Sequence, residues 1–315
     1  MTITRTGASI TYNDNTIITD ARTTMRGIFA YGGVGTSNQS MSNLISNTGA
    51  VSTDITGVGT ARRTVAATSY GNDRAMFAWG LTNNDWSNGS TNISNLVSNA
   101  GVIATDQSGI GTARGFLGGA GYGLNKGIFA YGYNASAYQS MSNLVSSAGV
   151  LASDTAGVGT ARYGPGAATY GVDKAIFGYG YSNGGRESKT NLVSNTGVVA
   201  TDTTGVGTTR YELAAAGYGG DKAIFGYGYT TTYVSISNLV SNTGVVATDT
   251  TGVGTARSGL AATSYGGDKA IFGYGATASN QSISNLVSNT GVVATDTTGV
   301  GTARAYLAGT SFNFI

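Results

Sequence analysis

The stretch Ser237-Asn-Leu-Val-Ser-Asn-Thr-Gly-Val-Val-Ala-Thr-Asp-Thr-Thr-Gly-Val-Gly-Thr-Ala-Arg257 is one of six near-copies in a chain of 315 residues. The copies share a leucine, which lies at Leu44, Leu96, Leu144, Leu192, Leu239 and Leu286. Successive copies are 52, 48, 48, 47 and 47 residues apart. A regular period of this length indicates one supersecondary unit copied in tandem, each unit too thin to bury its apolar face until a neighbour covers it.

Within residues 211–257, four short segments have the pattern of β-strands. Leu213–Gly219 is a run of small and apolar residues, which predicts an inner strand. A Gly-Asp-Lys turn leads to Ala223–Gly228, which is apolar on both faces, as in a strand buried between sheets. Ser237–Asn242 and the more polar Val245–Thr250 predict a third and a fourth strand. Because the i, i+3, i+4 apolar spacing of amphipathic helices is missing, the sequence predicts an all-β fold.

This unit resembles a Kelch-type repeat: a small-residue strand, a hairpin, an aliphatic and aromatic strand ending in glycines, a variable loop, two further strands and an Arg-bearing link. The resemblance covers approximately residues 26–312. The Kelch glycine doublet stands here as Gly-Tyr-Gly, as in Gly226-Tyr227-Gly228, and Thr or Ser stands in place of the fourth-strand Trp. The resemblance implies a six-bladed β-propeller of four-stranded antiparallel blades.

The expected organisation is a single β-propeller domain over residues 1–315. An N-terminal strand or hairpin segment (1–25) precedes the repeats, and a closing strand (305–315) follows them. The repeats cover approximately residues 26–62, 63–114, 115–162, 163–210, 211–257 and 258–304.

Two segments are candidates for the first inner strand. The tail Ala305–Phe312 matches Ser258–Tyr265, at the same distance after its Arg, yet no second strand follows it. The first repeat begins clearly only at its second strand, so we expect the tail to pair there and to close the ring. Alternatively, Ile17 precedes Ile28 by the same 11 residues that separate Leu213 from Ile224, so residues 8–20 are also a candidate.

Composition narrows the classes of function. The net charge is +2 and there is no basic run, so neither nucleic acid nor an anionic membrane is an expected partner. The chain has no Cys and no His, which removes thiol chemistry, disulfides and the commonest general base and metal ligand. We therefore expect no enzyme, no cofactor and no metal site. The first residues lack the apolar region of a signal peptide, and no run reaches the ~20 apolar residues of a membrane helix.

Each repeat carries an Asp eight residues before an Arg. These structural pairs are Asp54 and Arg62, Asp106 and Arg114, Asp154 and Arg162, Asp202 and Arg210, Asp249 and Arg257, and Asp296 and Arg304. A ring of carboxylates could bind cations or act in acid/base catalysis, but catalysis needs one distinct pair with separated pKa values rather than six equal sites. We expect the Arg to hold a loop or an Asp at the junction between blades.

The Gly-Tyr-Gly tyrosines allow two interpretations. They could form a ring that stacks on sugars, or they could pack in the core with each hydroxyl at an edge. Their position at the end of a core strand favours packing.

The repeats differ most in the loops between the second and third strands, which cover residues 33–40, 81–90, 133–139, 181–189, 229–234 and 276–281. In a propeller these loops share one face. Such a face is either a recognition surface or a set of drifting solvent-exposed turns. The preferred binding anchors on it are Trp86, Tyr138, Arg186 and Tyr233, because aromatic and Arg side chains dominate binding hot spots.

The amino-acid sequence of the repeats also resembles that of repeats in structural proteins of aquatic bacteriophages. This resemblance implies a non-enzymatic virion component, such as a capsid decoration, tail or fibre-associated propeller, assembled in the host cytoplasm. Its partners would be other virion proteins or a host surface glycan or protein. The alternative is a carbohydrate-binding, lectin-type propeller acting outside the cell. An enzyme is a third class, and it would depend on Asp, Glu187 or Glu212.

Overall fold

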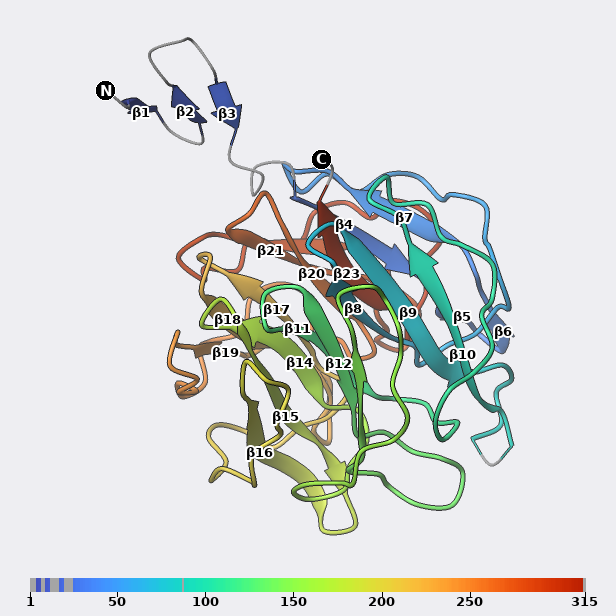
Figure 1. Ribbon diagram of the computed structural model, residues 1–315. Coiled ribbons are helices and arrows are strands. Elements are labelled where there is room, and N and C mark those ends of the chain that lie inside the picture. The colour runs from blue at the N-terminus through green and yellow to red at the C-terminus, as the bar shows by residue number, and fades with distance from the viewer. Residues whose placement is uncertain (1–3, 7–8, 12–16, 20–24, 87, 314–315) are drawn as a thin grey trace.

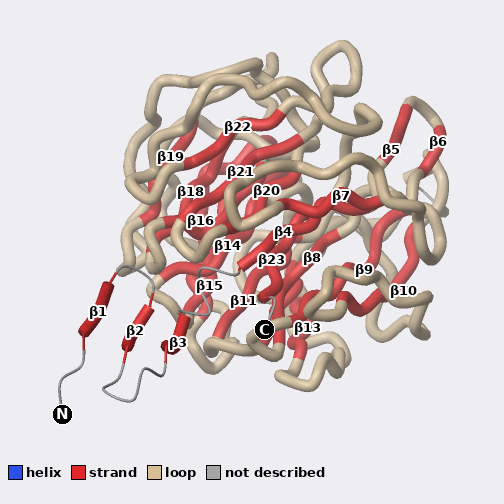
Figure 2. Tube along the Cα trace, turned by 90° about the horizontal axis from the view of Figure 1, so that it is seen from above, coloured by secondary structure: helices blue, strands red, loops and turns tan. Residues whose placement is uncertain are grey.

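The computed structural model describes residues 4–6, 9–11, 17–19, 25–86 and 88–313. Over these residues the regular structure is entirely β, as the sequence predicts (Figures 1 and 2). The strands form seven three-stranded antiparallel sheets and one two-stranded ribbon. Six of the three-stranded sheets correspond to the six repeats.

Each repeat sheet has a first, a second and a third strand, with the second in the middle. The first strands are β8 (Ala66–Tyr70), β11 (Gly118–Tyr122), β14 (Gly166–Tyr170), β17 (Ala214–Tyr218), β20 (Ala261–Tyr265) and β23 (Ala308–Asn313). The second strands are β9 (Arg74–Leu81), β12 (Lys126–Ala130), β15 (Lys174–Ser182), β18 (Lys222–Gly226), β21 (Lys269–Gly273) and β4 (Met25–Ala30). The third strands are β10 (Ser90–Val97), β13 (Ser142–Val145), β16 (Gly185–Val193), β19 (Ser237–Val240), β22 (Ser284–Val287) and β7 (Ser42–Ile45).

The second strand of each repeat is the buried centre of its sheet. In β18, Ile224 lies opposite Ala216 of β17 and Leu239 of β19. Ile224 and Phe225 are fully buried although they point to opposite faces of the sheet. Both faces are therefore covered by neighbouring sheets, which explains why this strand is apolar throughout.

The predicted fourth strand is wrong as a regular strand. Val245–Thr250 joins the third strand only through isolated bridges of Val246 to Val240 and of Thr250 to Ser237. Between these bridges, the Asn238 side chain donates from Nδ2 to the carbonyl oxygen of Ala247 at 3.0 Å. The side chain takes an acceptor that a regular ladder would use, so each repeat has three strands and one bridged segment.

The first repeat takes its first strand from the end of the chain. β23 pairs antiparallel with β4, with Ala308 opposite Ala30 and Thr310 opposite Ile28. The alternative segment, residues 8–20, contributes β2 (Ser9–Thr11) and β3 (Ile17–Thr19) to a separate sheet with β1 (Thr4–Thr6). Residues 8, 12–16 and 20 of that segment lie outside the described residues.

The first strands lie toward the middle of the molecule, whereas the labels of β7, β10, β16 and β19 lie toward its outside (Figure 1). Each first strand contacts the first strand of the next repeat, and β23 contacts both β20 and β8. The two-stranded ribbon, β5 (Gly33–Val34) and β6 (Ser37–Asn38), is formed by the variable loop of the first repeat.

A circuit of backbone hydrogen bonds joins the six repeats at one end of the first strands. In every repeat, the residue two positions after the link Arg donates its N–H to the carbonyl of the corresponding residue in the preceding repeat, over 2.7–3.0 Å. The bonds run from Thr64 to Tyr306, Tyr306 to Gly259, Gly259 to Glu212, Glu212 to Gly164, Gly164 to Phe116 and Phe116 to Thr64. The sixth bond therefore returns to the residue at which the first began.

Candidate functional site

The six link arginines are buried structural connectors. Arg210 is fully buried and donates from Nε to the carbonyl of Tyr227 at 2.9 Å, and from its terminal nitrogens to the carbonyl of Thr208 at 3.0 Å and to Asn238 Oδ1 at 2.6 Å. Its guanidinium also lies 4.1 Å from the ring centroid of Tyr179 in its own repeat, whereas Tyr227 and Asn238 belong to the following repeat. One side chain thus joins two repeats through hydrogen bonds and a cation–π contact.

The Asp and Arg of each sequence pair serve different junctions. Arg210 lies 4.0 Å from Asp249 of the following repeat, whereas Asp202 lies 3.9 Å from Arg162 of the preceding link. Each Arg thus lies near an Asp of the following repeat rather than near the Asp eight residues before it. The observed ion pairs are Arg62–Asp106, Arg114–Asp154, Arg162–Asp202, Arg210–Asp249, Arg257–Asp296 and Arg304–Asp54.

Each of these carboxylates is held by hydrogen bonds across the junction. Asp249 accepts bonds from the backbone N–H of Thr208 at 3.0 Å and from its hydroxyl at 2.6 Å. Partial burial alone would raise the pKa of Asp249, but the bonds from Thr208 and Asn238 outweigh it and lower that pKa. The aspartates are therefore ionised structural links and not proton donors.

The Gly-Tyr-Gly tyrosines pack in the core, as predicted. Tyr227 is 1 % exposed and donates its hydroxyl to the carbonyl of Val253 at 3.1 Å. Tyr31, Tyr131, Tyr179 and Tyr274 are equally buried, and Trp79 stands at this position in the second repeat. These rings are covered by link arginines, so they cannot form a sugar-stacking surface.

A different set of rings forms a continuous cluster beside the hydrogen-bond circuit. The ring centroids of Trp86 and Phe116 are 4.4 Å apart, those of Phe116 and Tyr306 are 5.8 Å apart, and those of Tyr163 and Tyr211 are 5.6 Å apart. Further contacts of this kind connect all members. We call this cluster the aromatic patch; it consists of Trp86, Phe116, Tyr133, Tyr138, Tyr163, Tyr181, Tyr211, Tyr229, Tyr233 and Tyr306.

The patch breaks the symmetry of the repeats. Two positions supply half of it: the residue after the link Arg and the residue after Gly-Tyr-Gly, which face each other in the bridges Tyr163 to Tyr181 and Tyr211 to Tyr229. In the sixth repeat the same bridge joins Ser258 and Ala276. Sequence reasoning missed the positions after the Arg, although their variation next to a residue that every repeat shares was a usable signal.

Three of the four predicted anchors, Trp86, Tyr138 and Tyr233, are members of this patch, and Arg186 adjoins it. Trp86 and Tyr233 are 39 % and 36 % exposed, and Tyr138 is partly exposed. Arg186 lies in β16 opposite Tyr181, and its charge acts on Tyr211. The Nε of Arg186 is buried and has no hydrogen-bond partner within the described part of the chain. Exposed aromatic bodies with polar ends and a nearby guanidinium are typical of a recognition surface.

Glu212 supplies a carboxylate at the end of the first strands where the hydrogen-bond circuit lies. It belongs to the hydrogen-bond circuit, and its Oε2 accepts a bond from the Ser258 hydroxyl at 3.1 Å. Burial raises the pKa of Glu212 to about 7, against the opposing effect of hydrogen bonds from Ser258 and Tyr306. Beside it is a cavity of about 70 Å³, whose walls come from the second and third residues after each link Arg.

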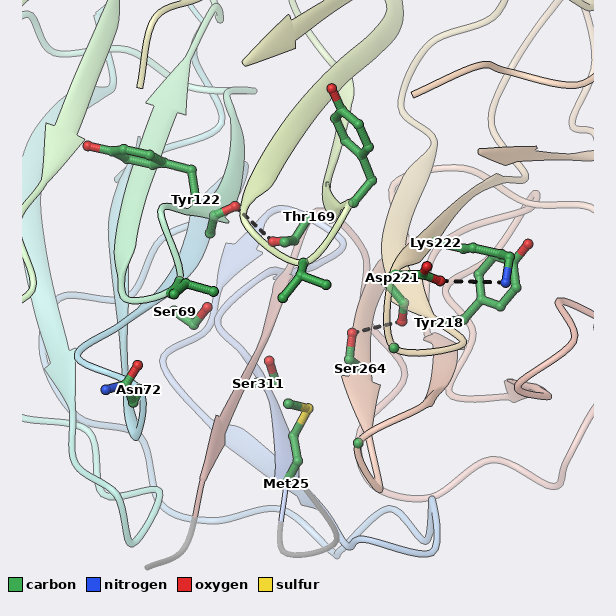
Figure 3. A pocket seen from close by; sticks show the side chains of 17 residues that line it. Met25, Ser69, Asn72, Tyr122, Thr169, Tyr218, Asp221, Lys222, Ser264 and Ser311 are labelled. Carbon is green, nitrogen blue, oxygen red and sulfur yellow. Dashed lines mark hydrogen bonds and ion pairs between the residues drawn. The ribbon is translucent and has the colours of Figure 1, made fainter. Parts of the chain in front are cut away.

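A larger cavity of about 450 Å³ lies at the opposite ends of the first strands (Figure 3). Hydroxyls and glycines line much of it, and the hydroxyls of Thr169 and Ser264 donate to the carbonyls of Gly121 and Gly217, each at 2.8 Å. A Cβ on Gly121 would lie only 3.0 Å from Ser69 Oγ. Small residues thus fit where the first strands converge. Close packing of these strands explains why glycines and small hydroxyl residues line the cavity.

The described residues contain no helix with the length and apolarity needed to cross a bilayer. The same residues contain no cluster of three or more acidic side chains placed to hold a metal ion. No protein-family model matches the chain, and no curated protein matches it.

Proposed function

We propose that the chain is a six-bladed β-propeller that serves as a non-enzymatic recognition protein. Six repeat sheets, the succession of contacts between their first strands, the pairing of β23 with β4 and the hydrogen-bond circuit support this architecture. Each blade has three strands and a bridged segment, and the C-terminal strand closes the ring. The variable loops then share one face.

The aromatic patch is the observation that carries the recognition role. The last repeats are nearly identical in their strands and links, so ten rings gathered at one end are a departure from the repeat rather than a part of it. Tyr and Trp bury a large apolar area and keep a polar atom at the edge. Arg186 and Glu212 add charge on either side, and together these groups suit a partner of mixed polarity.

The resemblance of the repeats to those in bacteriophage structural proteins supports a proposal for where this surface acts. The protein acts as a component of the virion, in particle assembly or in attachment to the host surface. Its partners are other virion proteins or a glycan or protein of the host. A low density of charge and an aromatic face fit attachment better than binding to nucleic acid.

Two measurements test this proposal. Quantitative mass spectrometry of purified particles should find the chain at a fixed stoichiometry. The isolated chain should compete with particles for host cells, and the double variant Trp86→Ala/Tyr138→Ala should compete at least about tenfold less well. Val198→Thr is a matched control, because Val198 is 65 % exposed and is not a member of the patch. Absence of the chain from particles, together with undiminished competition by the double variant, would reject the proposal.

A free lectin-type propeller is the second candidate, and the aromatic patch is also the observation that favours it. Exposed rings with hydroxyls at their edges can stack on sugar rings. Binding of the isolated chain to a glycan array, without any association with particles, would support this candidate over the virion role.

A further inference from the structure

Glu212 has an unusual combination of features. It is a non-glycine residue at φ 54°, as are Thr64, Phe116 and Tyr306 at the same position of other repeats, whereas the two neighbouring repeats have Gly164 and Gly259 there. Left-handed backbone disfavours a side chain, and burial disfavours a carboxylate. Three other repeats share the strained backbone, but Glu212 alone places a carboxylate at this position, which points to a role that packing does not explain.

The surroundings of Glu212 are aromatic. Tyr306 hydrogen-bonds to the carboxylate, and the Glu212 charge also acts on Tyr163 and Tyr211. Phe116 lies against Tyr306, with 5.8 Å between the ring centroids, and lines the small cavity together with Glu212. The carboxylate thus lies among the π-systems of four rings.

Within the described residues, the hydrogen-bond donors to the Glu212 carboxylate are hydroxyls, those of Ser258 and Tyr306, and not a cation. Of the two arginines of this region, Arg63 is engaged elsewhere, and none of the ion pairs between described residues joins Arg186 to Glu212. Arg63 donates to Asn38 Oδ1 at 2.5 Å and to the carbonyl of Gly35 at 3.1 Å, and Arg186 lies on the Tyr211 side. A partly buried carboxylate without a counter-charge is costly, and a cation from outside would remove that cost.

We propose that the mouth formed by Glu212, Phe116, Tyr163, Tyr211 and Tyr306 binds an alkylammonium group, with the carboxylate as counter-charge and the rings as cation–π partners. Aromatic rings around a carboxylate are the arrangement that recognises ammonium groups. The cavity of about 70 Å³ admits a small head group and is far below the ~300–1,000 Å³ of pockets that enclose whole ligands. The group would project from a larger partner that covers the aromatic patch.

This inference rests on the proposed recognition role, because it names the chemical group that the loop face takes. The ammonium group could belong to a choline-type head group or to a lysine side chain, and both present the same chemistry. A neutral sugar is the competing ligand. It would stack on the rings but would not require the negative charge of Glu212.

The test is a titration of the full-length protein, followed by the fluorescence of Trp86 and the tyrosines, with tetramethylammonium, choline and a lysine derivative blocked at both backbone ends. We expect saturable binding at pH about 8.5, and at least about tenfold weaker binding to Glu212→Gln. Glu187→Gln is the matched control, since Glu187 bonds to Ser182 and is ion-paired with Lys189. Its affinity should change by less than about twofold. Whichever of choline and the lysine derivative binds more tightly identifies the source of the ammonium group.

Binding should also weaken as the pH falls from about 8.5 to 5.5, because protonation removes the Glu212 charge. Of the other groups that face it, Tyr163, Tyr211 and Tyr306 have pKa values raised by burial and stay neutral over this range. Arginine side chains do not lose their charge in this pH range. Phe116→Leu should lower the affinity several-fold and leave the pH dependence in place.

Equal affinity of wild type and Glu212→Gln, both shown to be folded by thermal melting, would overturn the inference. Binding of neutral oligosaccharides but not of ammonium ions would also overturn it. Either result leaves the virion role intact if the Trp86 and Tyr138 variant still loses competition. Conversely, ammonium binding by a chain that is absent from particles would support this site and reject the virion role.

Discussion

At the scale of single residues, the link arginines show why the repeat requires Arg. Each guanidinium uses a planar fork to reach a backbone carbonyl of its own link and an Asn of the next repeat, while its face lies on an aromatic ring. A lysine has neither the fork nor the flat face. The strict recurrence of Arg therefore follows from geometry as well as from charge.

Replacing Arg210 by Lys or Met should lower the free energy of unfolding by about 3–5 kcal/mol, because it leaves Asn238 Oδ1 and two carbonyls without their buried partner. Urea denaturation measures this change. Arg186→Lys, at a partly exposed position, is the control and should change stability by less than about 1 kcal/mol. Unchanged stability of Arg210→Met would show that the buried network contributes nothing net.

Glu212 predicts a pH dependence of stability with a defined sign. Desolvation raises its pKa on folding from the ordinary 4.5 to about 7, so between these pH values the folded state holds a proton that the unfolded state has lost. Stability should therefore fall as the pH rises from about 4.5 to 7, by roughly 1–3 kcal/mol after allowance for partial exposure. The difference in melting temperature between wild type and Glu212→Gln across this range measures it. A difference that is constant with pH would contradict the raised pKa.

At the scale of elements, the strands were predictable and the fourth segment was not. Alternation, glycine punctuation and the apolar second strand are local signals. The failure at Val245–Thr250 arises from Asn238, whose side chain reaches across to Ala247 and to Asp249 Oδ1, at 3.0 and 2.9 Å. No propensity of residues 245–250 themselves reveals a competing donor supplied by another strand.

Asn238→Ala should loosen this bridged segment selectively. The change removes bonds to Ala247, Asp249 and Arg210, so we expect a loss of about 2–3 kcal/mol and faster amide exchange in residues 245–250. Hydrogen exchange read by mass spectrometry resolves the segment. Asn242→Ala, which removes one exposed bond to Asp221, is the control and should leave exchange nearly unchanged. Uniform acceleration along the whole chain would instead indicate global destabilisation.

At the scale of the whole molecule, the period of the repeat predicted the number of repeat sheets, and the match of the C-terminal tail to a first strand predicted its pairing with β4. The aromatic patch was harder to foresee. Trp86 and Tyr138 were suspected because they lie in loops, but Phe116 and Tyr306 follow link arginines far apart in the sequence. Only the meeting of distant repeats at one end brings these rings together, and a single repeat cannot show it.

Deletion of residues 305–315 should lower the melting temperature by more than about 10 °C, because β4 loses its partner strand and the contacts of β23 with β8 and β20 disappear. Differential scanning calorimetry provides the measurement. Deletion of residues 1–20 is the contrasting variant, since β1, β2 and β3 pair with one another, and its effect should be small. If the deletion of residues 1–20 lowered the melting temperature more, the N-terminal segment and not the C-terminal tail would be the strand that completes the first repeat sheet.

The hydrogen-bond circuit makes the starting point of the chain arbitrary. All six bonds point the same way around, each donor belonging to the repeat that follows its acceptor. No link in such a loop is a terminus, so the ends of the polypeptide can be relocated. A circular permutant that joins residue 313 to residue 25 through a short linker and opens between Ser182 and Gly185 would keep every one of these bonds. Duplication or loss of a repeat, in contrast, changes the number of hydrogen bonds in the circuit. The whole circuit must then form again with the new number of repeats.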